Sequence, residues 1–149
     1  MITQISLKNA ALQVLAAVSL FATATSFAAD AHTTTRFEGV RVNDGTATHQ
    51  RQGNIDALTW SQDFKLPDSP APHWQVVDSK GNVYLLQRLK IKDDKLNRTI
   101  TLPSYVLDVA KVQIYCAWAE ALLGEASFAQ PVVTAAGESM RVAGAPANR

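Results

Sequence analysis

The side chain with the most distinctive chemistry in this sequence is the thiol of Cys116, its only cysteine. It lies in the stretch KVQIYCAW, residues 111–118, in which β-branched and aromatic residues recur at every second position. This period of two predicts a strand with one buried face, and Cys116 lies on that face. There it is either a small buried hydrophobe, whose thiol stays protonated, or a redox-active or metal-binding sulfur.

Three histidines and scattered carboxylates are the other groups able to act as ligands or as acids and bases. We expect His32 to lie in a polar leader and His49 to be a solvated group near the end of a hairpin. His73 follows a proline-rich loop, at the point where the chain re-enters the predicted sheet. A histidine and a cysteine on neighbouring strands could ligate copper or haem iron, so His73 and Cys116 are the candidate cofactor ligands.

The motifs of common enzyme classes are missing from the sequence. It has no glycine-rich phosphate loop, no nucleophile elbow and no Cys-x-x-Cys pair. A Ser-His-Asp triad is defined in space rather than along the chain, and nothing in the sequence supports one. None of these motifs supports a turnover enzyme, and we expect a redox or binding module instead.

The first 28 residues have the pattern of a secretory signal peptide. Lys8 is their only charge, and the apolar run of residues 10–22 is too short to span a bilayer. The small-x-small pattern of residues 26–28 predicts cleavage between Ala28 and Ala29. We expect a periplasmic or secreted protein with no stable membrane anchor after cleavage. A single cysteine in such a compartment is buried, ligand-bound or paired with another chain, because it has no partner for an internal disulfide.

The charge balance argues against nucleic acid as a partner. The chain has 14 Lys and Arg against 13 Asp and Glu, and removal of Lys8 with the signal peptide makes the two sets equal. Nucleic acids and anionic membrane surfaces are bound by clustered positive charge. The densest charged stretch, residues 90–95, mixes both signs and is typical of a solvated turn.

Short alternating segments separated by turn residues predict an all-β fold, an antiparallel β-sandwich or barrel in a single domain over residues 36–128. Residues 29–35 are expected to form a disordered leader and residues 129–149 a disordered tail, because both lack apolar periodicity. The expected strands are residues 36–42, 46–50, 55–60, 73–78, 83–91, 96–102 and 111–118. The expected core residues are Leu58, Trp60, Leu85, Ile100, Val112, Ile114 and Trp118.

Several motifs occur in an order that resembles the DM-thirteen domain, a small β domain of Skeletor-type animal proteins and of many bacterial exported proteins. They are LTWSQDF, Ala71-Pro72-His73, Leu102-Pro103, KVQIYCAW and GEASF, and they cover about residues 58–128. The chain departs from the family where Asp-Pro-His is common, since Ala71 replaces the acid, and where Gln-x-Tyr is usual, since residues 97–99 are Asn-Arg-Thr. The first departure removes a carboxylate beside His73.

The resemblance implies an electron-transfer function in which Cys116 is the redox group. Family members are found beside DOMON and cytochrome domains, and this chain contains neither. The implied partner is therefore a separate redox or cytochrome-type protein. The alternative is a non-catalytic extracytoplasmic binding or structural β module in which Cys116 is only part of the core.

Overall fold

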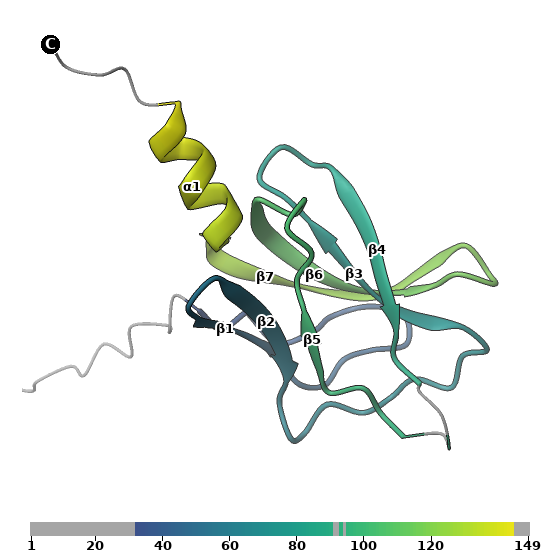
Figure 1. The fold of residues 1–149 in the computed structure, drawn as a ribbon. Coiled ribbons are helices and arrows are strands. Elements are labelled where there is room, and N and C mark those ends of the chain that lie inside the picture. The colour runs from purple at the N-terminus through teal and green to yellow at the C-terminus, as the bar shows by residue number, and fades with distance from the viewer. Residues whose placement is uncertain (1–31, 91–92, 94, 145–149) are drawn as a thin grey trace, which may run out of the picture.

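Two antiparallel β-sheets pack face to face in the computed structural model, which describes residues 32–90, 93 and 95–144 (Figure 1). The smaller sheet has the order β1 (Ala47–Gln52), β2 (Ile55–Trp60) and β5 (Thr99–Thr101). The larger has the order β4 (Val83–Arg88), β3 (Pro72–Val77), β6 (Asp108–Cys116) and β7 (Ala121–Val133). The predicted single-domain antiparallel sandwich is confirmed. The predicted signal peptide lies outside the described residues.

The tight turns lie where the sequence places glycine. Gly53 joins β1 to β2 with a φ of 59°, and Gly81 joins β3 to β4 with a φ of 87°. Both values fall in the left-handed region, which glycine enters without steric cost. The second turn is further fixed by Asp78, whose carboxylate accepts hydrogen bonds from the backbone N–H groups of Lys80 and Asn82.

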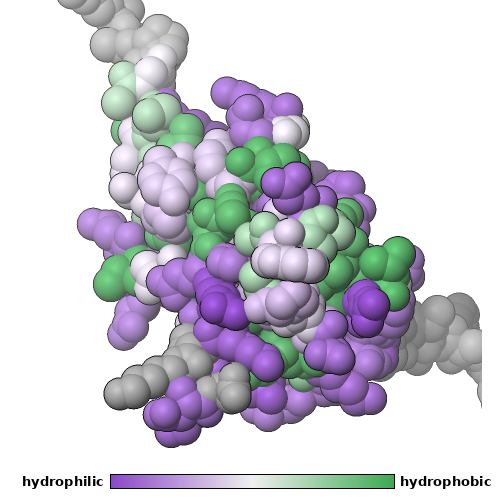
Figure 2. Space-filling model, turned by 90° about the vertical axis from the view of Figure 1, so that its right-hand side faces the viewer, coloured by the Kyte–Doolittle hydropathy of each residue, from purple (hydrophilic) through white to green (hydrophobic). Residues whose placement is uncertain are grey.

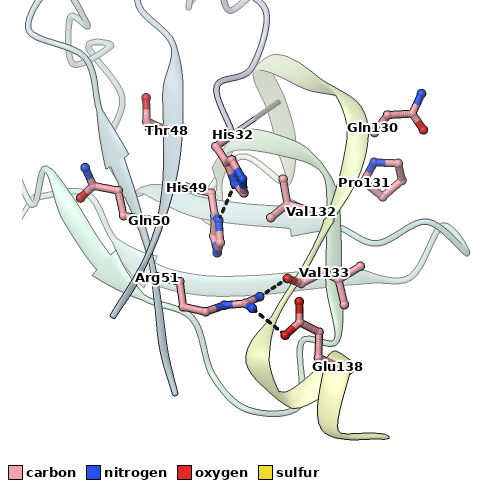
Figure 3. A pocket seen from close by; sticks show the side chains of 10 residues that line it. All are labelled: His32, Thr48, His49, Gln50, Arg51, Gln130, Pro131, Val132, Val133 and Glu138. Carbon is pink, nitrogen blue, oxygen red and sulfur yellow. Dashed lines mark hydrogen bonds and ion pairs between the residues drawn. The ribbon is translucent and has the colours of Figure 1, made fainter. Parts of the chain in front are cut away.

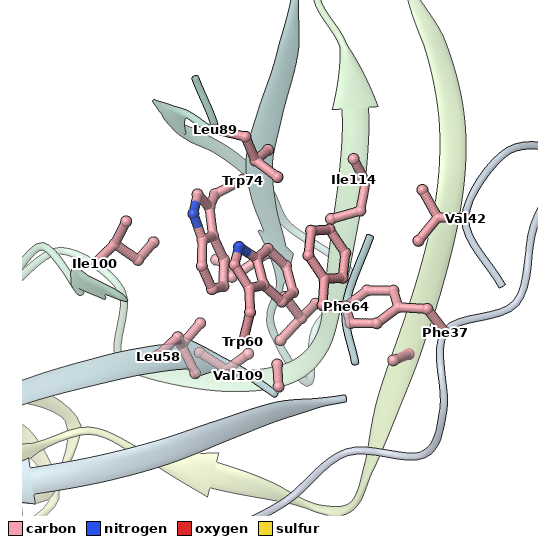
Figure 4. Packing of buried hydrophobic residues seen from close by; sticks show 14 of the residues in the cluster. Phe37, Val42, Leu58, Trp60, Phe64, Trp74, Leu89, Ile100, Val109 and Ile114 are labelled. Atoms are coloured by element: carbon pink, nitrogen blue, oxygen red, sulfur yellow. The ribbon is translucent and has the colours of Figure 1, made fainter. Parts of the chain in front are cut away.

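Aromatic rings from both sheets fill the space between them (Figure 4). The indoles of Trp60 on β2 and Trp74 on β3 are stacked with their ring centroids 3.3 Å apart, and Phe64 stacks on Trp60 at 4.5 Å. Trp60 and Trp74 therefore join the two sheets through one continuous contact. Five of the predicted core residues are buried: Leu58, Trp60, Ile100, Val112 and Ile114.

Two predicted core residues are exposed. Leu85 is 48 % exposed because Tyr84 and Leu86, and not Leu85, turn toward the core from β4. Trp118 is 77 % exposed because β6 ends at Cys116, so the alternation that we extended to Trp118 has already stopped. Both errors concern the phase of an alternating pattern near the edge or the end of a sheet.

The predicted strand of residues 36–42 forms only one isolated bridge, between Glu38 and Glu125. The segment crosses β7 closely at Gly39 and Gly124, where a Cβ on Gly39 would overlap the backbone of Gly124. The close backbone contact explains why glycine is required at position 39. It also explains why residues 36–42 do not pair with β7 as a regular strand.

The described residues next to the two ends of the predicted domain form more regular structure than we predicted. In the described part of the leader, Thr34 N–H donates to Ala47 O at 2.9 Å and Thr35 N–H donates to Ser127 O at 2.8 Å, so this segment contacts both sheets. Within residues 129–144, the described part of the expected disordered tail of residues 129–149, the chain continues β7 to Val133 and then forms helix α1 (Ala135–Ala143), which projects from one end of the sandwich (Figure 1).

The surface lacks a single large apolar area on the face in Figure 2, where hydrophobic and hydrophilic side chains are interspersed. The most exposed large hydrophobic residues come from separate segments, among them Val40, Tyr105, Trp118 and Val142. Within the described ranges, no helix has the length and apolar character that a membrane crossing requires.

Candidate functional site

Cys116 is the last residue of β6 and is only 1 % exposed. It lies on the core face of the sheet, in register with Pro72 on β3. Directly after Cys116, residues 117–120 connect β6 to β7. The backbone N–H of Ala117 in this connection donates to Ala71 O at 2.9 Å. The sulfur is therefore covered by one turn and one loop, and the turn residues 118–120 are themselves exposed.

Neighbouring hydroxyl and N–H groups lower the pKa of the Cys116 thiol from 9.0 to about 7. The largest influence is the hydroxyl of Ser69, followed by burial, which acts in the opposite direction, and then by the N–H groups of Ala119, Ala71 and Trp118. The Ala119 N–H lies 3.4 Å from Sγ. Donors that point at a sulfur stabilise its thiolate, which is the nucleophilic and metal-binding form.

Ser69 has an unusual position beside this thiol. Its Oγ is buried and makes no hydrogen bond of standard geometry with any described residue. A buried hydroxyl without a partner is unfavourable, and a negative charge on the neighbouring sulfur would provide an acceptor for it. The donors near Cys116 therefore favour the thiolate, and burial of the sulfur acts in the opposite direction.

His73 is not brought together with Cys116. In the β3–β6 register His73 is opposite Tyr115 while Pro72 is opposite Cys116, and successive residues of a strand point to opposite faces. The His73 ring is half-buried and its Nδ1 hydrogen-bonds to Ala71 O at 2.8 Å. The two candidate ligands for copper or haem therefore do not form a shared site. No group of three or more potential metal ligands occurs among the described residues.

A second polar cluster lies at the end of the sandwich next to α1, and it corrects our prediction for two histidines. His49 is 3 % exposed rather than solvated, and its Nε2 lies 2.8 Å from Asp56 Oδ1. His32, which we had assigned to the disordered leader, places its Nδ1 3.2 Å from Nδ1 of His49. Strand pairing explains the contact of His49 with Asp56, because they are diagonal neighbours on the inner face of β1 and β2.

Asp56 connects this cluster to the C-terminal helix. Its carboxylate accepts hydrogen bonds from Arg51 Nε at 2.9 Å and from the N–H of Ala135, the first residue of α1, at 2.7 Å. Burial would raise the pKa of Asp56, but the donors from Ala135, Arg51 and His49 outweigh it and the pKa is lowered. The Asp56 carboxylate is therefore ionised and can only accept hydrogen bonds. Nε2 of His49, which lies within hydrogen-bond distance of it, must then carry the proton.

Burial holds the pKa of His49 below its usual value of 6.5, against the opposing influence of Asp56. The neutral ring with its proton on Nε2 has an unprotonated Nδ1, which is the atom that faces His32. Arg51 is also paired with Glu138 on α1 at 2.8 Å and donates to Val133 O. These contacts fix the cluster and leave Nδ1 of His49 able to accept a hydrogen bond or to bind a metal ion.

An open pocket of about 660 Å³ lies over these side chains (Figure 3). His32, His49, Arg51 and Glu138 line one part of it, and residues 130–133 of β7 line another. The polar cluster beneath the pocket could have been anticipated from one signal in the sequence. Asp56 is in phase with Leu58 and Trp60 on β2, so it must point inward and needs a polar partner.

Comparison of the chain with models of known protein families, with curated proteins and with solved structures finds no match.

Proposed function

We propose that the protein is a thiol-based redox module that works through Cys116, in a periplasmic or secreted setting. The observation that carries this proposal is the Ala119 N–H directed at Sγ at 3.4 Å, beside the buried and unpartnered Ser69 hydroxyl, and together with neighbouring N–H groups these lower the pKa of the thiol to about 7. A cysteine that served only as a core hydrophobe would have its pKa raised by burial. About half of the Cys116 population would then be thiolate at neutral pH.

The reaction that suits such a group is thiol–disulfide exchange with a separate redox protein. The Cys116 thiolate attacks one sulfur of the partner's disulfide, a new S–S bond forms, and the partner's other sulfur leaves as a thiolate. The partner's leaving sulfur takes the electron pair of the broken bond, so no further oxidant is needed. Release then requires a thiolate from a third molecule, such as a low-molecular-weight thiol, because attack by the partner's own leaving thiolate would only reverse the step and this chain has no second cysteine.

Access to the sulfur depends on the turn of residues 117–120. The backbone of Glu120 in this turn has a φ of 50°, in the left-handed region that residues other than glycine rarely occupy. Trp118, the largest side chain of this turn, is exposed and so does not anchor the turn to the core. We expect this turn to open when a partner approaches, because it has little buried surface to hold it.

A second candidate function is a binding or structural β module in which Cys116 is part of the core. The observation that favours it is the 1 % exposure of the residue. In that case the sulfur is protected in the folded protein, and Cys116→Ser costs about 1–3 kcal/mol because a hydroxyl replaces an apolar sulfur.

Alkylation of the folded protein separates the two candidates. We expect a small haloacetamide to modify native Cys116, with a rate that reaches half its maximum near pH 7. The Ser69→Ala variant should shift this midpoint to higher pH, and Ser104→Ala, at an exposed serine of another loop, should not. If only denaturant-unfolded chain reacts, the redox proposal fails and the core-cysteine alternative stands.

A further inference from the structure

We propose that His32 and His49 bind a divalent transition-metal ion, Zn²⁺ or Cu²⁺, through their two Nδ1 atoms. This site lies at the α1 end of the sandwich and shares no residue with the surroundings of Cys116. It is therefore independent of the redox function proposed above.

The separation of the two nitrogens suits a shared metal. Their Nδ1 atoms are 3.2 Å apart, and the rings are inclined by only 22°. Two imidazole nitrogens on one tetrahedral Zn²⁺, each about 2.0–2.1 Å from the metal, would lie roughly 3.3 Å apart. The ring centroids are 5.5 Å apart, so the two Nδ1 atoms face each other almost head-on, and the exposed His32 ring must turn for both nitrogens to bind one ion.

The side chain of His49 is held as metal-ligating histidines are held. Its Nε2 donates to Asp56, which is fixed in turn by Arg51 and by the N–H of Ala135. A histidine that binds a metal commonly donates its other ring nitrogen to a carboxylate, which orients the ring and raises its basicity. Because His49 is buried, its ring cannot turn away from His32 without disturbing this network.

The open pocket leaves room for the remaining ligands. Its volume of about 660 Å³ admits water or a small ligand beside the two rings, and Glu138 contributes a carboxylate to its lining. Two protein ligands are fewer than the three of catalytic and the four of structural zinc sites, so we expect the metal to exchange readily rather than to form a permanent structural centre. Imidazole ligands favour Cu²⁺ and Zn²⁺ over Mg²⁺ and Ca²⁺.

The contact between the two rings has one other explanation, an N–H···N hydrogen bond in which His32 donates to His49. Calorimetric titration of the full chain, purified without a polyhistidine tag, distinguishes the two. We expect one Zn²⁺ or Cu²⁺ per chain, tighter binding of Cu²⁺ than of Zn²⁺, and no binding of Mg²⁺. His32→Ala should weaken binding by about tenfold or more, and the matched control His73→Ala should not.

Two further measurements test whether the metal ion binds at His32 and His49 rather than elsewhere on the protein. The titration is repeated in Cys116→Ser, where binding should be unchanged because the sulfur is not a ligand. Electron paramagnetic resonance of the Cu²⁺ form should show coupling to two imidazole nitrogens in the wild type and to one in His32→Ala. His32 is exposed, so that variant should keep the fold, which its circular dichroism verifies. Equal binding by His32→Ala and wild type, or no stoichiometric binding of either ion, would overturn the proposal.

Discussion

Cys116 and His49 are both buried residues with lowered pKa values, but the physical causes are opposite. Burial lowers the pKa of His49 because it disfavours the protonated, charged ring. At Cys116 hydrogen-bond donors overcome burial and favour the charged thiolate. The same direction of shift therefore makes one residue neutral and the other anionic near neutral pH.

The shift at Cys116 predicts how stability depends on pH. The folded thiol loses its proton near pH 7 and the unfolded thiol near pH 9, so the unfolded chain binds more protons between these values. The free energy of unfolding of the wild type should therefore rise from pH 7 to pH 9 relative to that of Cys116→Ser. Urea unfolding under reducing conditions measures both profiles. Parallel profiles would show that the thiol titrates alike in the folded and unfolded chain.

At the scale of elements, α1 is positioned mainly by its N-terminus. Thr134 is the N-cap, and its Oγ1 accepts from Gly137 N–H and donates to the backbone oxygens of Val106 and Leu107. Thr134→Ala removes the cap and a buried hydroxyl, and we expect it to lower the free energy of unfolding by about 1–2 kcal/mol. Thermal denaturation followed by circular dichroism measures this loss.

A matched control lies on the same helix. Ser139 is exposed and its hydroxyl only donates back to Ala135 O. Ser139→Ala should change stability by less than about 0.5 kcal/mol. Equal effects of the two substitutions would mean that the N-cap does not hold α1 on the body.

The sequence predicted elements well where one face is apolar and poorly where contacts come from distant residues. The predicted strand 55–60 matches β2, because Leu58 and Trp60 alternate with smaller or polar residues. Helix α1 was missed because its anchors, Thr134 and the Asp56 carboxylate, act through distant contacts rather than through an apolar stripe. His49 was misplaced because β1 is polar on both faces, so its pattern does not show which side is buried.

At the scale of the whole molecule, the stacked pair Trp60 and Trp74 joins the sheets. Trp74 is fully buried, and Trp74→Ala should lower the free energy of unfolding by about 3–5 kcal/mol because it leaves a large cavity between the sheets. Trp118→Ala is the control, because that side chain is largely exposed and its loss should change stability by less than about 0.5 kcal/mol. Chemical denaturation of both variants tests the difference, and similar midpoints would contradict the assigned role of Trp74.

The hydrogen bonds that close the sandwich have a consequence for the time the chain takes to fold. Ser127 N–H bonds to Thr35 Oγ1 across 92 positions, Arg51 to Val133 O across 82, and Ala135 N–H to Asp56 across 79. β1 and β2 pair locally, but the bonds that tie them and the preceding segment to β7 and α1 form only after almost the whole chain is available. All-β proteins with such distant contacts fold over roughly milliseconds to seconds, far more slowly than helical bundles of similar size. During synthesis the β1–β2 and β3–β4 hairpins can form early, but the second edge of β3 stays unpaired until β6 has emerged, and for that interval this edge is open to association with other chains.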